Sequence, residues 1–249
     1  MISKPSDLKG KNIGRVIQLL LAKPDTPRVE LARQTELTKT TISSIVASLI
    51  DLGIAEELSG EKTGLVGKAP IPVRIRSDAA TVIGVNLARG STTGVAMSAN
   101  GKLLASCAKS VSNMTRADAT ANLFDVVQRL INKCYRNEIR VDAIGIGAPS
   151  PLDKEKGVIY SPFGLSDWRD FTIGEITEKR FGLPVFLVND GDGAAFGMKC
   201  FGKCRDISSF ISLYFDEGIG AGIILKDEIY SGSFGYSGEI SYALLKSFC

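Results

Sequence analysis

Residues 141–149, Val-Asp-Ala-Ile-Gly-Ile-Gly-Ala-Pro, decide the fold of most of the chain. The short apolar run in this stretch predicts a buried strand that ends in a turn containing glycine and proline. A long amphipathic helix is predicted before it, over residues 116–136, because apolar side chains recur there at helical spacing. A helix near residues 173–181 and a strand over residues 185–188 follow it. This alternation predicts an α/β domain with a mixed sheet.

A pattern of strand, loop, strand, tight turn and strand occurs over residues 82–105 of this body, with its last strand predicted over residues 102–107. The pattern partly repeats over residues 211–228. The first copy contains the loop 86–91, and the second contains the loop 216–220. We expect two related lobes that face a cleft. A glycine-containing loop in each lobe is suited to hold phosphate through backbone N–H groups, although turn geometry alone also explains such glycines.

The first 77 residues follow a different pattern. Helices are predicted over residues 12–22, 28–35 and 38–52, with Thr38 as N-cap of the third helix and Gly53 ending it. Two strand-like segments, 54–58 and 72–76, enclose a long loop. Three helices, a tight turn and a hairpin with a long tip predict a winged helix-turn-helix domain over residues 1–77.

A recognition helix of this kind enters the major groove with its N-terminal residues toward the base edges. Short hydroxyl side chains and a lysine at these positions suit contact with bases and phosphates, and lysines of the wing suit the DNA backbone. The predicted DNA-binding residues are Thr38, Lys39, Thr40, Thr41, Ser43, Ser44, Lys62 and Lys68. The segment carries 12 basic and 8 acidic residues, and the remainder carries 18 and 19. This excess is compatible with a polyanionic partner, and a helical module for protein contacts remains the alternative.

The composition of the 249 residues excludes several classes of protein. Hydrophobic residues make up 44% and charged residues 23%, as in ordinary globular proteins, and no apolar run is long enough to span a membrane. Five dispersed cysteines without a secretory signal favour reduced thiols in the cytoplasm. Histidine is absent, which excludes catalysis by a Ser-His-Asp or Cys-His arrangement and the usual zinc sites with imidazole ligands.

Five segments of the body together resemble one known family. They are Ala143–Pro149, Trp168, Phe181–Asp190, Gly218–Gly222 and Gly238–Ile240. In this order they are similar to the ROK family of repressors and sugar kinases, within the actin-like ATPase superfamily. The preceding module resembles the DNA-binding part of the family's repressors.

The resemblance implies a ribonuclease H-like effector domain of the sugar-kinase type over residues 78–249. Its first lobe would cover 78–190, and an incomplete second lobe would cover 191–249. It also implies ligand-binding residues: Gly147, Asn189, Asp190, Glu239 and Tyr242. Asp190 matches the aspartate that acts as the catalytic base in the family's kinases, because a carboxylate can accept the proton of an attacking hydroxyl. A helix N-cap for residues 191–201 is the alternative role of Asp190.

The sequence departs from the family pattern at both phosphate loops. The first loop, Asp-x-Gly-Gly-Thr in the family, reads Asn-Leu-Ala-Arg-Gly over residues 86–90. In the second loop Asp216-Glu217 replaces Gly-Thr, which adds two carboxylates that repel the phosphates of a nucleotide. We therefore expect no ATP cofactor and no kinase activity. Tyr242 takes the position of the family's histidine, and Cys200 and Cys204 have no partner ligands, so we also expect no metal.

The sequence thus predicts a cytoplasmic transcriptional repressor of the ROK type with a double-stranded DNA operator, a sugar effector and a homodimeric or higher assembly. The chain ends early in the second lobe, so we expect a C-terminal truncation that leaves Ile223 and Leu225 without cover. One alternative is a hexose kinase that uses ATP. Another is a regulator that binds only macromolecules.

Overall fold

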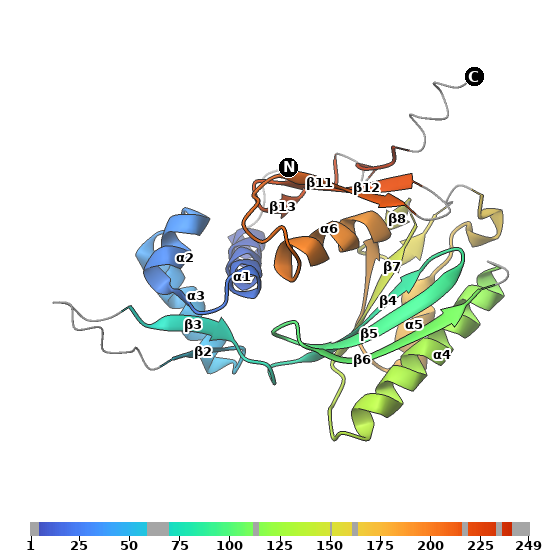
Figure 1. The fold of residues 1–249 in the computed structure, drawn as a ribbon, viewed down its shortest axis with the longest axis horizontal. Helices are drawn as coiled ribbons and strands as arrows, with labels where there is room; N and C mark the ends of the chain where they lie inside the picture. The colour runs from blue at the N-terminus through green and yellow to red at the C-terminus, as the bar shows by residue number, and fades with distance from the viewer. Residues whose placement is uncertain are drawn as a thin grey trace.

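The fold was analysed in a computed structural model, which describes residues 5–58, 70–111, 115–149, 151–160, 164–215, 219–232 and 236–240. Figure 1 shows a small N-terminal group of helices beside a larger α/β body. In the described part of the chain no helix is both long and apolar enough to cross a membrane.

The N-terminal group contains three helices and a small antiparallel sheet with strand order β1-β3-β2. Its elements are α1 (Pro5–Ala22), β1 (Thr26–Pro27), α2 (Arg28–Thr35), α3 (Lys39–Asp51), β2 (Ala55–Glu57) and β3 (Pro72–Ile75). Helix α1 begins before the predicted Asn12, because polar residues extend it beyond the apolar stripe that marked the prediction. A separate apolar core holds these elements together, formed by side chains such as Val16 and Leu20 of α1 and Ile42 and Val46 of α3.

Helix α3 has the two ends that the sequence predicts. The Thr38 hydroxyl accepts a hydrogen bond from the Thr41 N–H at 3.1 Å. At the other end Gly53 takes a φ of 70°, and its N–H donates to the Ile50 carbonyl at 2.8 Å. The Ile54 N–H donates to the Leu49 carbonyl at 2.8 Å, which completes a Schellman motif. Local hydrogen bonds therefore define where α3 begins and ends.

The body is built on a five-stranded mixed sheet with strand order β10-β7-β4-β5-β6. The strands are β4 (Thr81–Leu87), β5 (Ser91–Ser98), β6 (Leu103–Ser110), β7 (Ala143–Ala148) and β10 (Val185–Asn189), with helices α4 (Arg116–Tyr135) and α5 (Ile173–Phe181) between them. The short elements β8 (Leu152–Asp153), β9 (Val158–Ile159) and η1 (Ser166–Trp168) connect β7 to α5. The two helices pack on one face of the sheet and bury Ile83, Leu123, Ile144 and Trp168 completely.

Helix α6 (Asp190–Cys200) covers part of the other face, and a second antiparallel sheet lies on its far side (Figure 1). That sheet contains β11 (Phe210–Phe215), β12 (Ile219–Leu225) and β13 (Glu228–Ile229). The repeated pattern predicted over 211–228 is therefore confirmed as strands. Its outer face is apolar and open: Leu225 is exposed, as predicted, and so are Ile211, Leu213 and Phe215, whereas Ile223 is half-buried.

The first predicted phosphate loop is shorter than expected. Asn86 and Leu87 belong to β4, where they pair with Thr93 and Thr92 of β5. The prediction of a loop over 86–91 is wrong in this respect, because Leu87 is buried in the core and its burial extends the strand. A tight turn at residues 88–90 remains, closed by a 3.0 Å hydrogen bond from the Ala88 N–H to the Ser91 carbonyl.

Candidate functional site

Two parallel strands end side by side where most predicted ligand-binding residues lie. β10 pairs with β7 so that Asn189 stands opposite Ala148 and Val188 opposite Gly147. The carboxyl ends of parallel strands form the edge at which α/β proteins bind ligands. Gly147 packs closely at this edge, because a Cβ there would lie 3.1 Å from the Asn86 amide oxygen.

Helix α6 begins directly at this edge. The Asn189 side chain caps the helix by accepting the Asp192 N–H at 3.0 Å. Asp190 is the first helical residue, and its carboxylate accepts the Gly191 N–H at 2.8 Å. The alternative role of Asp190 as the N-cap is therefore wrong. An asparagine one residue earlier has the extended backbone and the side-chain oxygen that an N-cap requires.

Three glycines bring Glu239 to the beginning of α6. A Cβ on Gly191 would lie 3.0 Å from the Ala221 carbonyl, and one on Gly238 would lie 1.8 Å from the same oxygen. A Cβ on Gly222 would lie 2.1 Å from the Gly191 carbonyl, so here backbone packs directly on backbone. The Ala221 N–H also donates to the Gly238 carbonyl at 2.8 Å. Asp190 and Glu239 thus each adjoin a glycine that packs against Ala221.

A buried carboxylate that the sequence analysis did not single out lies in the first turn of α6. Asp192 is 4% exposed, and its Oδ2 lies 3.0 Å from the Lys154 ammonium and 3.5 Å from the Ser231 hydroxyl. Its other oxygen, Oδ1, is buried and has no hydrogen-bond partner among the described residues. Lys154 follows β8, which belongs to the connection between β7 and α5, and Ser231 follows β13 of the second sheet. The contacts of Asp192 with these two residues therefore link that connection to the second sheet. The spacing of Asp190 and Asp192 could have indicated the carboxylate, but no local signal pairs it with a lysine so distant in sequence.

Side chains of β4 and of the turn after it contact other parts of the protein where the first phosphate loop was predicted. The Asn86 amide donates to the Tyr214 hydroxyl at 3.3 Å and so links β4 to β11. The Arg89 guanidinium lies against Gly164, where a Cβ would be 2.9 Å from it. Asp216 and Glu217 lie outside the described residues. In the part of the chain that the structure describes, no group of three Cys, Asp or Glu side chains is placed to hold a metal ion.

The predicted DNA-reading residues lie along one face of α3. Thr38, Lys39, Thr40, Ser43 and Ser44 are exposed, and Thr41 is half-buried. The opposite face, with Ile42, Ile45, Val46 and Leu49, is buried in the N-terminal core. Lys62 and Lys68 of the predicted wing, like Tyr242 of the ligand-binding set, lie outside the described residues.

Arg28, which the sequence analysis did not single out, braces α3 from α2. Its guanidinium donates to the Ser43 carbonyl at 3.2 Å and to the Glu57 carboxylate at 2.8 Å. One side chain therefore ties α2, α3 and β2 together. No feature of the sequence around Arg28 indicates that its side chain would contact α3 and β2.

Known proteins resemble the chain along nearly its whole length. A xylose repressor of Caldicellulosiruptor bescii is 26% identical over 243 residues, which cover 96% of this chain and 59% of the repressor. A crystal structure of a ROK family transcriptional regulator, a homologue of the E. coli Mlc protein, matches 94% of this chain and 59% of its own, with a TM-score of 0.70 and 25% identity.

An enzyme of the same fold also matches. A ROK family glucokinase from Streptomyces griseus, in complex with glucose and AMPPNP, covers 65% of this chain and 49% of its own, with a TM-score of 0.59 and 25% identity. The mixed α/β fold implied by the resemblance is therefore confirmed. The chain spans about 59% of the length of the repressor it matches. The ROK family model matches residues 78–247, and the chain belongs to the ROK family.

Proposed function

We propose that this protein is a DNA-binding transcriptional repressor that responds to a sugar. Residues 1–77 form its winged helix-turn-helix domain and residues 78–249 its effector domain. The observation that carries the proposal is the asymmetry of α3: its apolar face is buried in a small separate core, and its N-terminal face presents hydroxyls and Lys39 to solvent. A capped helix that exposes short polar side chains at its N-terminus suits insertion into the major groove.

The proposed DNA binding is tested with genomic fragments that the purified chain selects. Lys39→Ala is expected to weaken binding to a selected fragment by about 1–3 kcal/mol if the lysine contacts a base. The matched control is Lys102→Ala, which removes an exposed lysine from the turn between β5 and β6. Equal affinities of Lys39→Ala and the native chain at fixed salt, or no selected fragment at all, would contradict the proposal.

The proposal of a sugar effector is supported by the placement of Gly147, Asn189 and Asp190 at the carboxyl ends of β7 and β10. Glu239 follows Gly238, which packs on the same Ala221 carbonyl as Gly191. Carboxylates and an amide there can accept and donate the hydrogen bonds that sugar hydroxyls need. D-Xylose is the first sugar to test, because the relative from Caldicellulosiruptor bescii is named a xylose repressor. A sugar that binds the folded chain must raise its melting temperature, and Asp190→Asn and Glu239→Gln should remove that rise. A panel of pentoses and hexoses that leaves the native melting temperature unchanged would refute a sugar effector.

We further propose that the chain lacks kinase activity, acts in the cytoplasm and binds its operator as a homodimer. The Asn86–Tyr214 hydrogen bond and the Arg89 guanidinium against Gly164 occupy the region where the family pattern would place phosphates, which supports the first point. Incubation with ATP and a panel of sugars tests it. Sugar phosphorylation that is abolished in Asp190→Asn would instead support the sugar kinase. Light scattering of the DNA complex tests the dimer.

A further inference from the structure

Helix α6 connects the proposed sugar site to the N-terminal helices. Its first turn holds Asp190 and the cap residue Asn189, and its last turn ends at Cys200 beside α1 (Figure 1). A helix of 11 residues is about 16 Å long, so α6 reaches from the proposed sugar site to α1. The two ends of α6 are thus joined by one continuous helix.

The last turn of α6 contains a buried lysine with three acceptors. Lys199 is 5% exposed, and its ammonium donates to the Arg205 carbonyl at 2.9 Å and to the Ile207 carbonyl at 3.1 Å. It also forms an ion pair with Asp227 in the turn between β12 and β13. Removing a charged group from water is costly unless it is paired. Lys199 thus fixes two segments, residues 201–208 and 226–228, to the end of α6.

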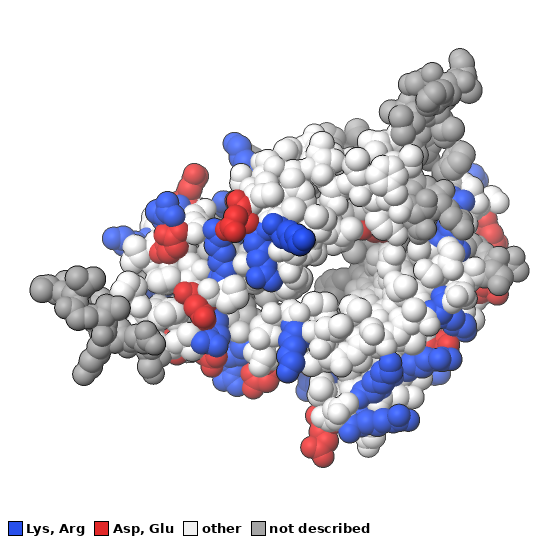
Figure 2. Space-filling view, viewed as in Figure 1, with Lys and Arg blue, Asp and Glu red and all other residues white. Residues whose placement is uncertain are grey.

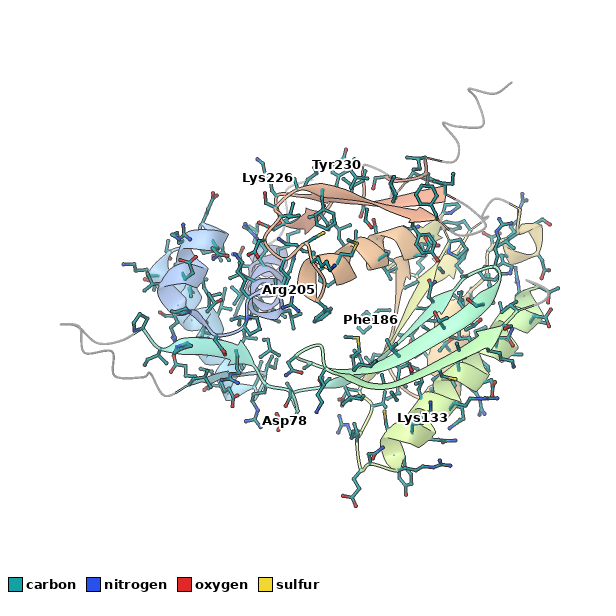
Figure 3. The ribbon with its side chains drawn as sticks, in the orientation of Figure 1. Asp78, Lys133, Phe186, Arg205, Lys226 and Tyr230 are labelled. Atoms are coloured by element: carbon teal, nitrogen blue, oxygen red, sulfur yellow. The ribbon has the colours of Figure 1, made fainter. Side chains whose placement is uncertain are left out.

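These two segments carry the acceptors that hold α1. Asp206 forms an ion pair with Lys23 at 2.9 Å, and Glu228 forms one with Arg15 at 3.4 Å. The Gln18 amide donates to the Asp227 carbonyl. We call these groups the α1–α6 seam, defined by Arg15, Gln18, Lys23, Lys199, Asp206, Asp227 and Glu228. Figure 2 shows basic and acidic side chains gathered at this place, and Figure 3 labels Arg205 between α1 and α6.

The two sides of the seam differ in rigidity. The Lys199 side is buried, but the carboxylates facing α1 are exposed, with Asp206 at 82% and Glu228 at 62% side-chain exposure. Exposed ion pairs contribute little and are screened by salt. A cavity of about 130 Å³ lies between the two sides and is lined mostly by polar and charged side chains. The seam therefore has a firm anchor on α6 and a contact with α1 that can be released.

We propose that Lys199 is a positioning residue that couples the sugar site to the DNA-reading helix. Lys199 sets the place of Asp206 and Glu228 at the end of α6, and these two carboxylates set the place of α1. Because α1 shares its core with α3, a shift of α6 changes how α3 is presented to DNA. This proposal rests on the proposed function, and it adds the path by which the sugar would act.

The seam itself is tested without any ligand, by hydrogen exchange of the full chain. Lys199→Met is expected to raise exchange in residues 15–23 and 205–208 at least threefold. Lys23→Asp should raise exchange in the same residues, and the swap Lys23→Asp with Asp206→Lys should restore protection. The control Lys11→Asp makes the same charge change on an exposed part of α1. Unchanged exchange in Lys199→Met, or a swap that fails to restore protection, would overturn the proposal.

The coupling is tested with a selected DNA fragment and D-xylose, or with whichever sugar raises the melting temperature. In Lys199→Met, the DNA affinity should stay within threefold of the native value. The sugar-dependent rise in melting temperature should stay within 2 °C of the native rise. The sugar-induced change in DNA affinity should fall at least fivefold. A native response in this variant would overturn the coupling. If the native chain binds neither DNA nor sugar, the proposed function fails, while the exchange experiment still decides whether the seam exists.

Discussion

At the scale of single residues, the pairing of Asp192 with Lys154 makes a clear prediction. Lys154→Met removes the cation beside a carboxylate that is 4% exposed and whose other oxygen has no hydrogen-bond partner within the part of the chain that the structure describes. Leaving a buried charge unpaired is destabilising, so we expect a loss of about 1–3 kcal/mol in the free energy of unfolding, measured by urea denaturation.

The matched control for this prediction is Lys179→Met. It also separates a lysine from a carboxylate, but Lys179 and Glu175 are both exposed on α5. We expect no change beyond the error of the measurement. Equal effects of the two substitutions would show that Asp192 does not depend on Lys154.

A second residue-scale prediction concerns acid stability. Hydrogen bonds from the Lys156 N–H at 3.0 Å and the Tyr160 hydroxyl at 3.0 Å hold the pKa of Asp153 at about 2, below its ordinary value of 3.8. The folded chain thus favours the ionised carboxylate. The resulting stabilisation is complete above pH 4 and is lost as the pH falls toward 2.

This prediction is checked by urea unfolding between pH 5 and pH 2. Asp153→Asn should lose less stability than the native chain between pH 4 and pH 2, because the amide does not titrate. An NMR titration of the Asp153 carboxyl with a midpoint near 4 would show that the hydrogen bonds do not form.

Residue roles were predictable from sequence where the signal is local. The Thr38 cap could be predicted because a threonine directly precedes an apolar helical stripe. Asn189 and Asp190 were placed correctly at a strand end, but which of the two caps α6 depends on backbone angles that both side chains tolerate. Lys154 and Lys199 could not be predicted, since their partners come from segments that only the tertiary fold brings together.

At the scale of elements, the close packing of α6 on β12 leads to a prediction about glycine. Gly222→Ala places a Cβ 2.1 Å from the Gly191 carbonyl and 2.5 Å from the Ala195 Cβ. To make room for the methyl group, α6 and β12 would have to move apart, which loosens the packing between them. We expect a loss of about 1–3 kcal/mol in the free energy of unfolding.

Gly220→Ala is the control, because a Cβ at this position of the same strand meets no atom within 4 Å. It should leave stability nearly unchanged. Asp190 and Glu239 depend on the same packing, so Gly222→Ala should also reduce the sugar-dependent rise in melting temperature. Identical unfolding curves for the two variants would mean that α6 does not rest on β12.

The elements themselves were largely predictable. Strand and helix periodicity located every element of the five-stranded sheet, because each has one face in the core. The length of the first loop was not predictable, since Leu87 extends β4 only by packing into a core formed by distant residues. The strand β1 was also missed, because two residues that include a proline carry no strand periodicity.

At the scale of the whole molecule, two separate cores predict unfolding in two steps. The chain has one tryptophan, Trp168, which is completely buried in the core of the body. Its fluorescence reports the body alone, whereas circular dichroism at 222 nm also reports α1, α2 and α3. The described contacts between the parts include exposed ion pairs of the seam, which high salt weakens.

In 1 M NaCl, we expect the circular dichroism signal to begin to fall at a lower urea concentration than the fluorescence signal. Lys199→Met should separate the two curves in the same way at low salt. Curves that coincide in every one of these conditions would show a single cooperative unit.

The hydrogen bond between Asn86 and Tyr214 is one of the contacts that join the two sheets of the body. Both groups are neutral and the donor–acceptor distance is 3.3 Å, so the bond contributes about 0.5–1.5 kcal/mol. Loss of this bond alone would change the ratio of joined to parted conformations by roughly two- to twelvefold. A small molecule that binds only the parted conformation contributes RT ln(1 + [L]/Kd), which is about 2.7 kcal/mol when its concentration is 100 times its Kd. A ligand at that concentration therefore offsets this one bond without the energy of nucleotide hydrolysis.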